Sequence, residues 1–191
     1  MATSLQKIKN ISRFGSFIVT LLLITIPIFY IAKWILIDQP MIKQLAALGI
    51  CCAIKGPTAF IKPWMIAWTP GLKLLGLGAD LIGHLPMWFS FFILKFILKN
   101  YSEGNVFTTI NARYYQYLAG LFLLSALVCK PIFDAMMTLV ATLNNPPGER
   151  ILSLTFNITN IQEILWGGFV MIIAYVMSEA SKLEEEQQLT I

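Results

Sequence analysis

SFIVTLLLITIPIFYIAKWILI, residues 16–37, is the stretch that decides the fold class of this chain. A hydrocarbon core about 30 Å thick is crossed by roughly 20 helical residues that rise about 1.5 Å each. Backbone groups inside lipid must find hydrogen-bond partners within their own segment, so an apolar run of this length favours a helix over a strand. Asp38, Gln39 and Pro40 follow it and predict its end. The stretch therefore predicts a membrane-spanning helix.

Three more apolar stretches of the same kind follow, at residues 77–97, 115–143 and 161–178. Of the 191 residues, 57% are hydrophobic and 13% are charged, whereas a soluble domain has about 25% charged residues. The sequence therefore predicts an all-α, integral membrane four-helix bundle whose first partner is the lipid bilayer. We expect a single transmembrane domain over residues 1–191, with a polar C-terminal tail at 179–191.

Residues 38–75 form the predicted outer loop between the first two spanning helices. Within it, Gln44–Ile54 is apolar but too short to span, which is the length expected of an interfacial piece. We therefore predict an extracytoplasmic loop that contains a short interfacial helix, with Trp64 and Trp68 at the membrane–water boundary. Residues 41–60 also fit a re-entrant segment or a fifth crossing, and a fifth crossing would invert the topology of everything downstream.

Lysine and arginine residues beside helix ends predict the orientation, because cytoplasmic loops carry the excess of these residues. An even number of crossings then places both termini in the cytoplasm. The sequence is therefore interpreted as a multi-pass protein of the cytoplasmic (inner) membrane. The two short cationic clusters are Lys7, Lys9 and Arg13 before the first helix, and Lys95, Lys99 and Arg113 around the turn between the second and third helices.

Several classes of function find no support in the sequence. Cys51 and Cys52 are adjacent and Cys129 lies inside an apolar stretch, so no pair has zinc or redox spacing. Short catalytic and phosphate-binding motifs are absent from the sequence. No basic patch with interleaved aromatic residues indicates nucleic-acid binding. We therefore expect no enzyme activity, no cofactor, no metal site and no direct contact with nucleic acid.

Six ionisable residues fall within the predicted spans, where charge is costly and each such residue suggests a functional hypothesis. Asp80 and His84 are four residues apart and share a helix face, as do Lys130 and Asp134. Lys130 is expected to pair with Asp134 or with Asp80. Three interpretations are open: side chains that reach the interface, a structural polar core, and a binding or sensing site. The candidate polar cluster is Lys33, Asp80, His84, Lys130, Asp134 and Glu163.

Local signals predict how the helices begin, bend and pack. Pro131 should kink the third helix, because a mid-helix proline removes a hydrogen bond. Asn160 is predicted as the N-cap of the last helix, with Glu163 three residues further on. Small residues let helices approach closely in lipid. They predict packing faces at Ala79 and Gly83 in the second helix, and at Gly167, Ala174 and Ser178 in the fourth.

Two short patterns carry a resemblance to a known family. Leu183–Ile191 reads LEEEQQLTI, and the turn before the third helix has Gly104-Asn105-Val106-Phe107 followed by Asn111. An ending Leu-x-Glu-Glu-x-x-Leu-Thr-Ile and a stretch Gly-x-x-Phe-x-x-x-Asn resemble the bacterial family called domain of unknown function 2975, over roughly residues 75–191. The resemblance implies a small four-helix inner-membrane protein of unassigned activity and without assigned catalytic residues. It also implies partnership with small helix-turn-helix regulators.

Two functions from different classes follow from these patterns. The leading hypothesis is a non-enzymatic membrane protein that binds and regulates a cytoplasmic partner through its inner turn and acidic tail, with glutamates that attract a basic domain. The alternative is a small transporter or channel subunit that uses the outer polar cluster; a membrane enzyme acting on lipid has the weakest support. The candidate partner-binding residues are Gly104, Phe107, Asn111, Leu183, Glu184, Glu185 and Glu186.

Overall fold

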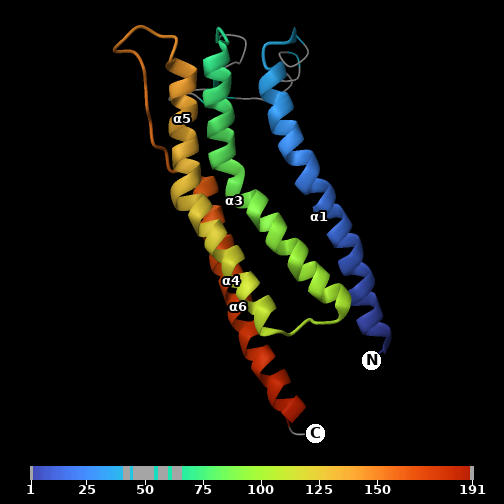
Figure 1. Ribbon diagram of the computed structural model, residues 1–191. Coiled ribbons are helices and arrows are strands. Elements are labelled where there is room, and N and C mark those ends of the chain that lie inside the picture. The colour runs from blue at the N-terminus through green and yellow to red at the C-terminus, as the bar shows by residue number, and fades with distance from the viewer. Residues whose placement is uncertain (1, 41–43, 45–53, 56–59, 62–65, 190–191) are drawn as a thin grey trace. The chain divides into compact units, whose positions relative to one another are not determined.

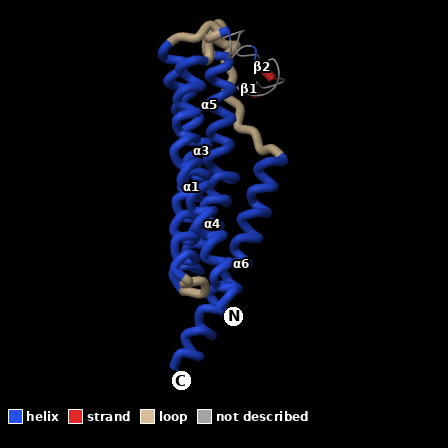
Figure 2. Tube along the Cα trace, turned by 90° about the vertical axis from the view of Figure 1, so that its right-hand side faces the viewer, coloured by secondary structure: helices blue, strands red, loops and turns tan. Residues whose placement is uncertain are grey.

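The computed structural model describes residues 2–40, 44, 54–55, 60–61 and 66–189 of the chain. Most of these residues are helical (Figure 1), and two strands of two residues each pair with one another (Figure 2). The prediction of an all-α chain is thus confirmed, with that small addition. In chain order the elements are α1 (Ala2–Leu36), β1 (Ile54–Lys55), β2 (Phe60–Ile61), α3 (Pro70–Glu103), α4 (Thr109–Leu124), the π-helical turn η2 (Ser125–Cys129), α5 (Lys130–Thr142) and α6 (Ile158–Leu189).

Four helical segments are long and apolar enough to cross a membrane. Only 11% to 33% of the most apolar window of each is buried inside the protein. Large apolar side chains such as Leu165, which is 68% exposed, therefore face outward in a way that water would disfavour and lipid tails accept. The predicted four-helix membrane bundle is confirmed. The segments are Gln6–Leu36, Pro70–Glu103, Thr109–Thr142 and Ile158–Glu186.

The helices extend beyond the apolar stretches that predicted them. α3 begins at Pro70, within the expected outer loop, and proline is favoured in the first turn of a helix. α6 continues through the expected polar tail to Leu189, because leucine, glutamate and glutamine are strong helix formers. α6 also begins at Ile158, so Asn160 lies inside the helix and the prediction of Asn160 as N-cap is wrong.

The loop between α1 and α3 contains a feature that the sequence did not predict. β1 and β2 pair antiparallel, with Ile54 opposite Ile61. Gly56 and Pro57 fall between the two strands in the sequence, and both residue types favour turns. The expected short interfacial helix at 44–54 lies largely outside the described residues.

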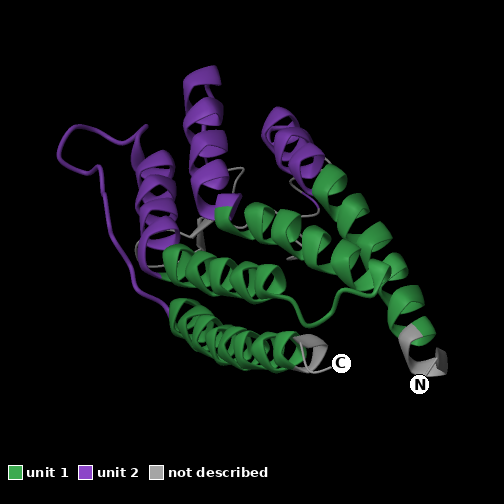
Figure 3. Cartoon of the chain, turned by 60° about the horizontal axis from the view of Figure 1, so that its bottom comes forward, with its two compact units in different colours: residues 1–25, 86–126, 158–191 green, residues 26–85, 127–157 purple. Residues whose placement is uncertain are grey.

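The chain divides into two compact units, which Figure 3 colours separately. α1, α3 and the α4–η2–α5 segment each run from one unit into the other. Pro27, Pro86 and Pro131 lie close to those three crossings. Unit 1 consists of Met1–Thr25, Pro86–Ala126 and Ile158–Ile191, and unit 2 of Ile26–Leu85 and Leu127–Asn157.

The core of unit 2 lies among α1, α3 and α5. Ala79 is fully buried in it, and a Cβ atom added to Gly83 would lie 2.8 Å from Cγ of Phe133. These two small residues let α3 come close to its neighbours, so the predicted packing face of the second helix is confirmed. The buried core residues are Trp34, Ile37, Ile66, Leu72, Ala79, Met137 and Val140.

In unit 1, α6 packs along α4 (Figure 1). Ala119 on α4 and Ala174 on α6 are fully buried, and a Cβ atom added to Gly167 would lie 3.3 Å from the carbonyl oxygen of Ala119. Close backbone approach of this kind needs small side chains. It confirms Gly167 and Ala174 as packing residues, whereas Ser178 is half-buried and Ser181 one turn on is buried.

Two interrupted stretches of helix are repaired by side chains from neighbouring helices. Pro27 lacks the N–H that would pair with the carbonyl of Leu23, and Trp88 Nε1 donates to that oxygen at 3.1 Å. The expected break near Pro131 is the π-helical turn η2, where the carbonyl of Ala126 accepts a 2.8 Å hydrogen bond from Asn160 Nδ2. Backbone polar groups in lipid must be paired, and these side chains meet that requirement.

Candidate functional site

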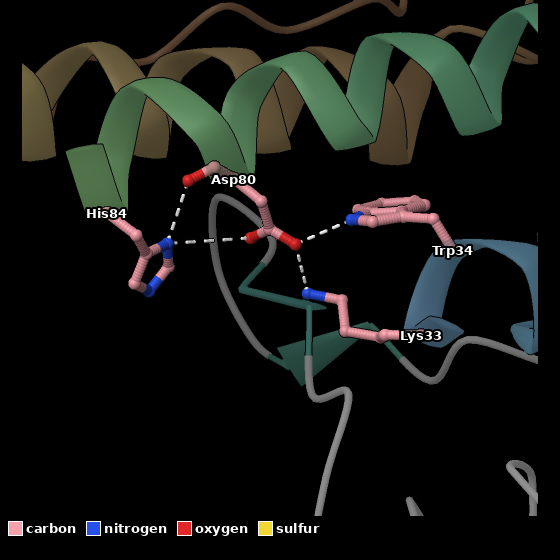
Figure 4. Close-up of polar contacts among 4 residues, drawn as sticks. All are labelled: Lys33, Trp34, Asp80 and His84. Atoms are coloured by element: carbon pink, nitrogen blue, oxygen red, sulfur yellow. Dashed lines mark hydrogen bonds and ion pairs between the residues drawn. The ribbon is translucent and has the colours of Figure 1, made fainter. Parts of the chain in front are cut away.

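The Asp80 carboxylate is the centre of a polar cluster inside unit 2 (Figure 4). Asp80 comes from α3 and is only 2% exposed. Its Oδ2 accepts hydrogen bonds from Lys33 Nζ and, at 2.5 Å, from Trp34 Nε1, both on α1. One carboxylate oxygen therefore binds both a cation and an indole from the neighbouring helix.

His84 lies one turn further along α3, on the same face as Asp80. Its Nδ1 is 2.9 Å from the backbone oxygen of Asp80 and 4.0 Å from the carboxylate Oδ1. The imidazole is held between two aromatic rings, Tyr30 at 4.4 Å and Phe133 at 5.6 Å between centroids. Oδ1 of Asp80 is buried and accepts no hydrogen bond from the described residues.

Gly76 explains how α1 comes so close to α3. A Cβ atom added to Gly76 would lie 1.9 Å from Cη2 of Trp34, so the indole occupies the space of the missing side chain. Residues 76, 80 and 84 share one helical face because they are spaced by four. The glycine thus makes room for the indole, and Asp80 one turn later receives its N–H.

The cluster is close to electrically neutral. An isolated charged side chain at the centre of a spanning helix costs roughly 2.5–3.5 kcal/mol on insertion scales, so Lys33 and Asp80 each gain by the presence of the other. Lys33 Nζ also lies 5.5 Å from the ring centroid of Tyr30 and 5.0 Å from that of Trp34, where a cation is attracted to the ring face. Ion pair and rings together make a buried charge tolerable.

The other predicted cluster residues are distributed differently. Asp134 on α5 accepts hydrogen bonds from Thr155 Oγ1 and Asn157 Nδ2, each at 2.9 Å. Lys130 and Glu163 are half-buried, and the pairing of Lys130 with a carboxylate stays a prediction. The described part of the chain contains no group of three or more histidine, cysteine, aspartate or glutamate residues that would hold a metal ion.

Sequence reasoning missed three residues that complete these sites. Trp34, Thr155 and Asn157 all donate to buried carboxylates. Trp34 directly follows Lys33 in the sequence, and this position is the signal that could have indicated its role. Thr155 and Asn157 lie in the segment before α6, whose path the sequence does not reveal.

A second polar site lies in the turn between α3 and α4, within unit 1. Asn111 is fully buried at its centre and accepts a 2.6 Å hydrogen bond from Asn100 Nδ2. Its own Nδ2 donates to the carbonyl oxygens of Asn105 at 2.7 Å and Val106 at 2.9 Å. One amide therefore ties the end of α3, the turn and the start of α4 together.

The backbone of this turn is also fixed by residue type. Gly104 has φ +98°, a conformation that side-chain-bearing residues rarely adopt. Thr108 caps α4, accepting from the N–H of Asn111 at 3.3 Å. Phe107, between them, is 49% exposed, so the turn presents an aromatic ring that it does not bury.

The predicted acidic residues lie on the last turns of α6. Leu183 is 60% exposed, and Glu184, Glu185 and Glu186 are exposed beside it. α6 extends past the beginning of α4 at the end of unit 1 that carries the α3–α4 turn (Figure 1). The structure thus brings Gly104, Phe107 and Asn111 into one turn and leaves the glutamates on a separate helix end.

Comparison with known proteins identifies the family to which the chain belongs. No curated protein and no solved structure matches the chain. The family described as "Protein of unknown function (DUF2975)" matches residues 57–191, which include Asp80, His84, the α3–α4 turn and all of α6. Lys33 and Trp34 precede the matched region. Because the match covers well over half of its length, the chain belongs to the DUF2975 family, whose function is unknown.

Proposed function

We propose that this protein is a non-enzymatic component of the cytoplasmic membrane that binds a cytoplasmic protein through the α3–α4 turn and the acidic end of α6. The observation that carries the proposal is the turn itself. Three hydrogen bonds on the buried Asn111 amide hold it, and it presents the exposed ring of Phe107. About half of that ring is left uncovered by the described residues.

A turn of this kind has the properties of a docking site. Binding costs less conformational entropy when the contact surface is already ordered, and the Asn111 network orders this one. Aromatic side chains supply much of the binding energy at protein interfaces. Phe107 is therefore the residue we expect to enter a pocket on the partner.

The acidic end of α6 indicates that the binding surface of the partner is positively charged. Glu184, Glu185 and Glu186 are exposed on consecutive helical positions, and opposite charge speeds and orients encounter with a basic domain. A small helix-turn-helix regulator has such a basic surface. We infer that the membrane protein holds the regulator, and that the glutamates and the DNA compete for the same basic face.

Site-specific photo-crosslinking in intact cells tests this function. A photoreactive phenylalanine analogue at position 107 should crosslink to a soluble protein that mass spectrometry identifies. The same analogue at Phe89, which is 46% exposed on the spanning part of α3, is the matched control and should not. The identified protein should bind the purified membrane protein, and Phe107→Ala should weaken that binding at least tenfold. Equal crosslinking at both positions, or binding unaffected by Phe107→Ala, contradicts the proposal.

A transport function is the second candidate, and the buried Lys33–Asp80 pair favours it. Charged groups inside spanning helices often mark ion or substrate pathways. Purified protein in liposomes should then carry a small ion or solute, and Asp80→Asn should abolish the flux. Liposomes that stay impermeable to protons, alkali cations and small anions speak against this candidate.

A further inference from the structure

His84 is the single histidine of the chain, and its hydrogen bond defines which ring nitrogen carries the hydrogen. Nδ1 lies 2.9 Å from the backbone oxygen of Asp80. A carbonyl oxygen only accepts, so Nδ1 must donate. In the neutral ring, Nε2 then holds a lone pair with no hydrogen. The His84 side chain is 33% exposed, so this lone pair belongs to a ring that the protein does not seal off.

The Asp80 carboxylate is arranged to receive a positive charge on that ring. Oδ2 accepts from both Lys33 and Trp34, whereas Oδ1 accepts no hydrogen bond from the described residues although it is fully buried. Buried carboxylate oxygens are normally paired, so this one has unused capacity. It lies 4.0 Å from His84 Nδ1, at the limit of an ion pair.

Among the contacts that the structure gives for the imidazole within the described residues, Asp80 is the charged group; Lys130 lies one turn before Phe133 on α5. From α1, the Tyr30 ring lies tilted by 39° against the imidazole, and Lys33 is already bound to Asp80 Oδ2. From α5, Phe133 contributes an uncharged ring. The carboxylate of Asp134, also on α5, is directed to donors in the segment before α6.

We propose that His84 and Asp80 form a proton-binding site. A proton from water adds to the lone pair on Nε2, while Nδ1–H keeps its hydrogen bond to the backbone oxygen of Asp80. The positive charge of the resulting imidazolium then attracts Asp80 Oδ1, which lies 4.0 Å from Nδ1. Because both carboxylate oxygens belong to one rigid group, movement of Oδ1 toward the ring also moves Oδ2 relative to Trp34 Nε1. The indole of Trp34 therefore senses the protonation of His84. The site goes beyond partner binding and does not depend on it.

Because the chain has a single histidine, the histidine signals in an NMR experiment can be assigned to His84 without ambiguity. Full-length protein is prepared without a histidine tag, labelled with [15N]histidine and [15N]tryptophan, and placed in lipid nanodiscs. The two ring nitrogens of His84 then report tautomer and protonation by NMR from about pH 8 to about pH 5, the interval in which histidines usually change charge. Trp34→Phe identifies the Trp34 indole signal.

The expected result has three parts, and each can fail. The neutral ring should carry its hydrogen on Nδ1, both nitrogens should be protonated at the acidic end, and the Trp34 indole shift should follow the same curve. In Asp80→Asn the indole should lose its pH response, while Asp134→Asn, a change at the other buried aspartate of unit 2, should keep it. A neutral ring with hydrogen on Nε2, a ring that stays neutral to the acidic end, or an indole that does not move overturns the proposal. These wild-type measurements decide the question even if a variant does not fold.

Discussion

Trp88 Nε1 donates a 3.1 Å hydrogen bond to the carbonyl oxygen of Leu23, four residues before Pro27. In an uninterrupted helix that oxygen would accept from the N–H of residue 27, which proline lacks. The indole thus replaces a hydrogen bond that the helix cannot make itself. A proline is tolerated in this apolar helix because a tryptophan on the next helix completes its backbone pairing.

This relationship predicts a coupled pair of substitutions. Trp88→Phe should destabilise the protein by about 0.5–2 kcal/mol, the range found for polar contacts between helices in lipid. In a Pro27→Ala background the same change should cost less, because an alanine at that position supplies the missing N–H. Thermal unfolding in detergent of the four variants gives the coupling. Strictly additive effects would show that the indole does not serve this carbonyl.

A second prediction compares two glycines two residues apart on α3. Gly76→Ala should destabilise by about 1–3 kcal/mol, because its Cβ atom would lie 1.9 Å from the Trp34 ring and overpack the contact. Gly78 has no atom within 4 Å of an added Cβ, so Gly78→Ala should be neutral or stabilise by up to about 1 kcal/mol through helix propensity. Loss of folded protein on heating measures both. Equal effects at the two positions would contradict the close α1–α3 contact.

The Lys33–Asp80 ion pair gives the third prediction. Lys33→Met alone leaves a buried carboxylate without its cation and should destabilise by about 3–5 kcal/mol. Adding Asp80→Asn removes the remaining charge, so the double variant should be more stable than Lys33→Met alone. Unfolding at increasing concentrations of a denaturing detergent measures the difference in stability between the single and the double variant. Should the second change instead add to the first loss, the pair does not stabilise the helices as a unit.

A fourth prediction concerns the amide that holds the α3–α4 turn. Asn111→Ala leaves the carbonyls of Asn105 and Val106 without this donor, and should cost about 1–3 kcal/mol. The turn should also be cut faster by a protease added from its side of the membrane. Gln116→Ala, at an exposed position of α4, is the matched control and should behave like the wild type. Unchanged cleavage of the Asn111 variant would mean that the turn is held by other contacts.

The fifth prediction tests the topology with reporter fusions. Because the cationic clusters flank the N-terminus and the α3–α4 turn, fusions after residues 60, 105, 150 and 191 should read outside, inside, outside and inside. An inside reading at 150 would reverse the assignment. Deletion of residues 183–191 should leave the protein inserted at near-normal level, because Glu184, Glu185 and Glu186 are exposed and the segment is polar in sequence.

The spanning helices were readable from the sequence because length and apolarity alone define them. Within one helix, Asp80 and His84 could also be placed on a common face from their spacing. The choice of Lys33 as the partner of Asp80 could not, because the register between two helices depends on which side chains fit. Here Gly76 decides that fit by admitting the Trp34 ring. The periodicity of the sequence does not indicate which glycine of a helix contacts a neighbouring helix.

The side-chain hydrogen bonds to the backbone at the two interrupted stretches of helix could not be predicted from the sequence either. Pro131 predicts a disturbance in its helix, and η2 is that disturbance. That Asn160 would donate to Ala126 rather than cap α6 depends on two segments far apart in the chain. An asparagine near a helix start reads as a cap from local rules, and those rules contain nothing about a neighbouring π-helical turn.

The unbroken course of α6 has a mechanical consequence. Its 32 residues are about 48 Å long at about 1.5 Å each, well beyond a hydrocarbon core about 30 Å thick. Because the helix is stiff, the direction in which Glu184 and Glu185 point about the axis of α6 is set where Gly167 and Ala174 pack against α4. A single residue inserted after Ser178 would turn the acidic end by about 100° without touching its chemistry. A partner that binds those glutamates is therefore also sensitive to the rotation of α6 about its axis and to its displacement along the membrane normal.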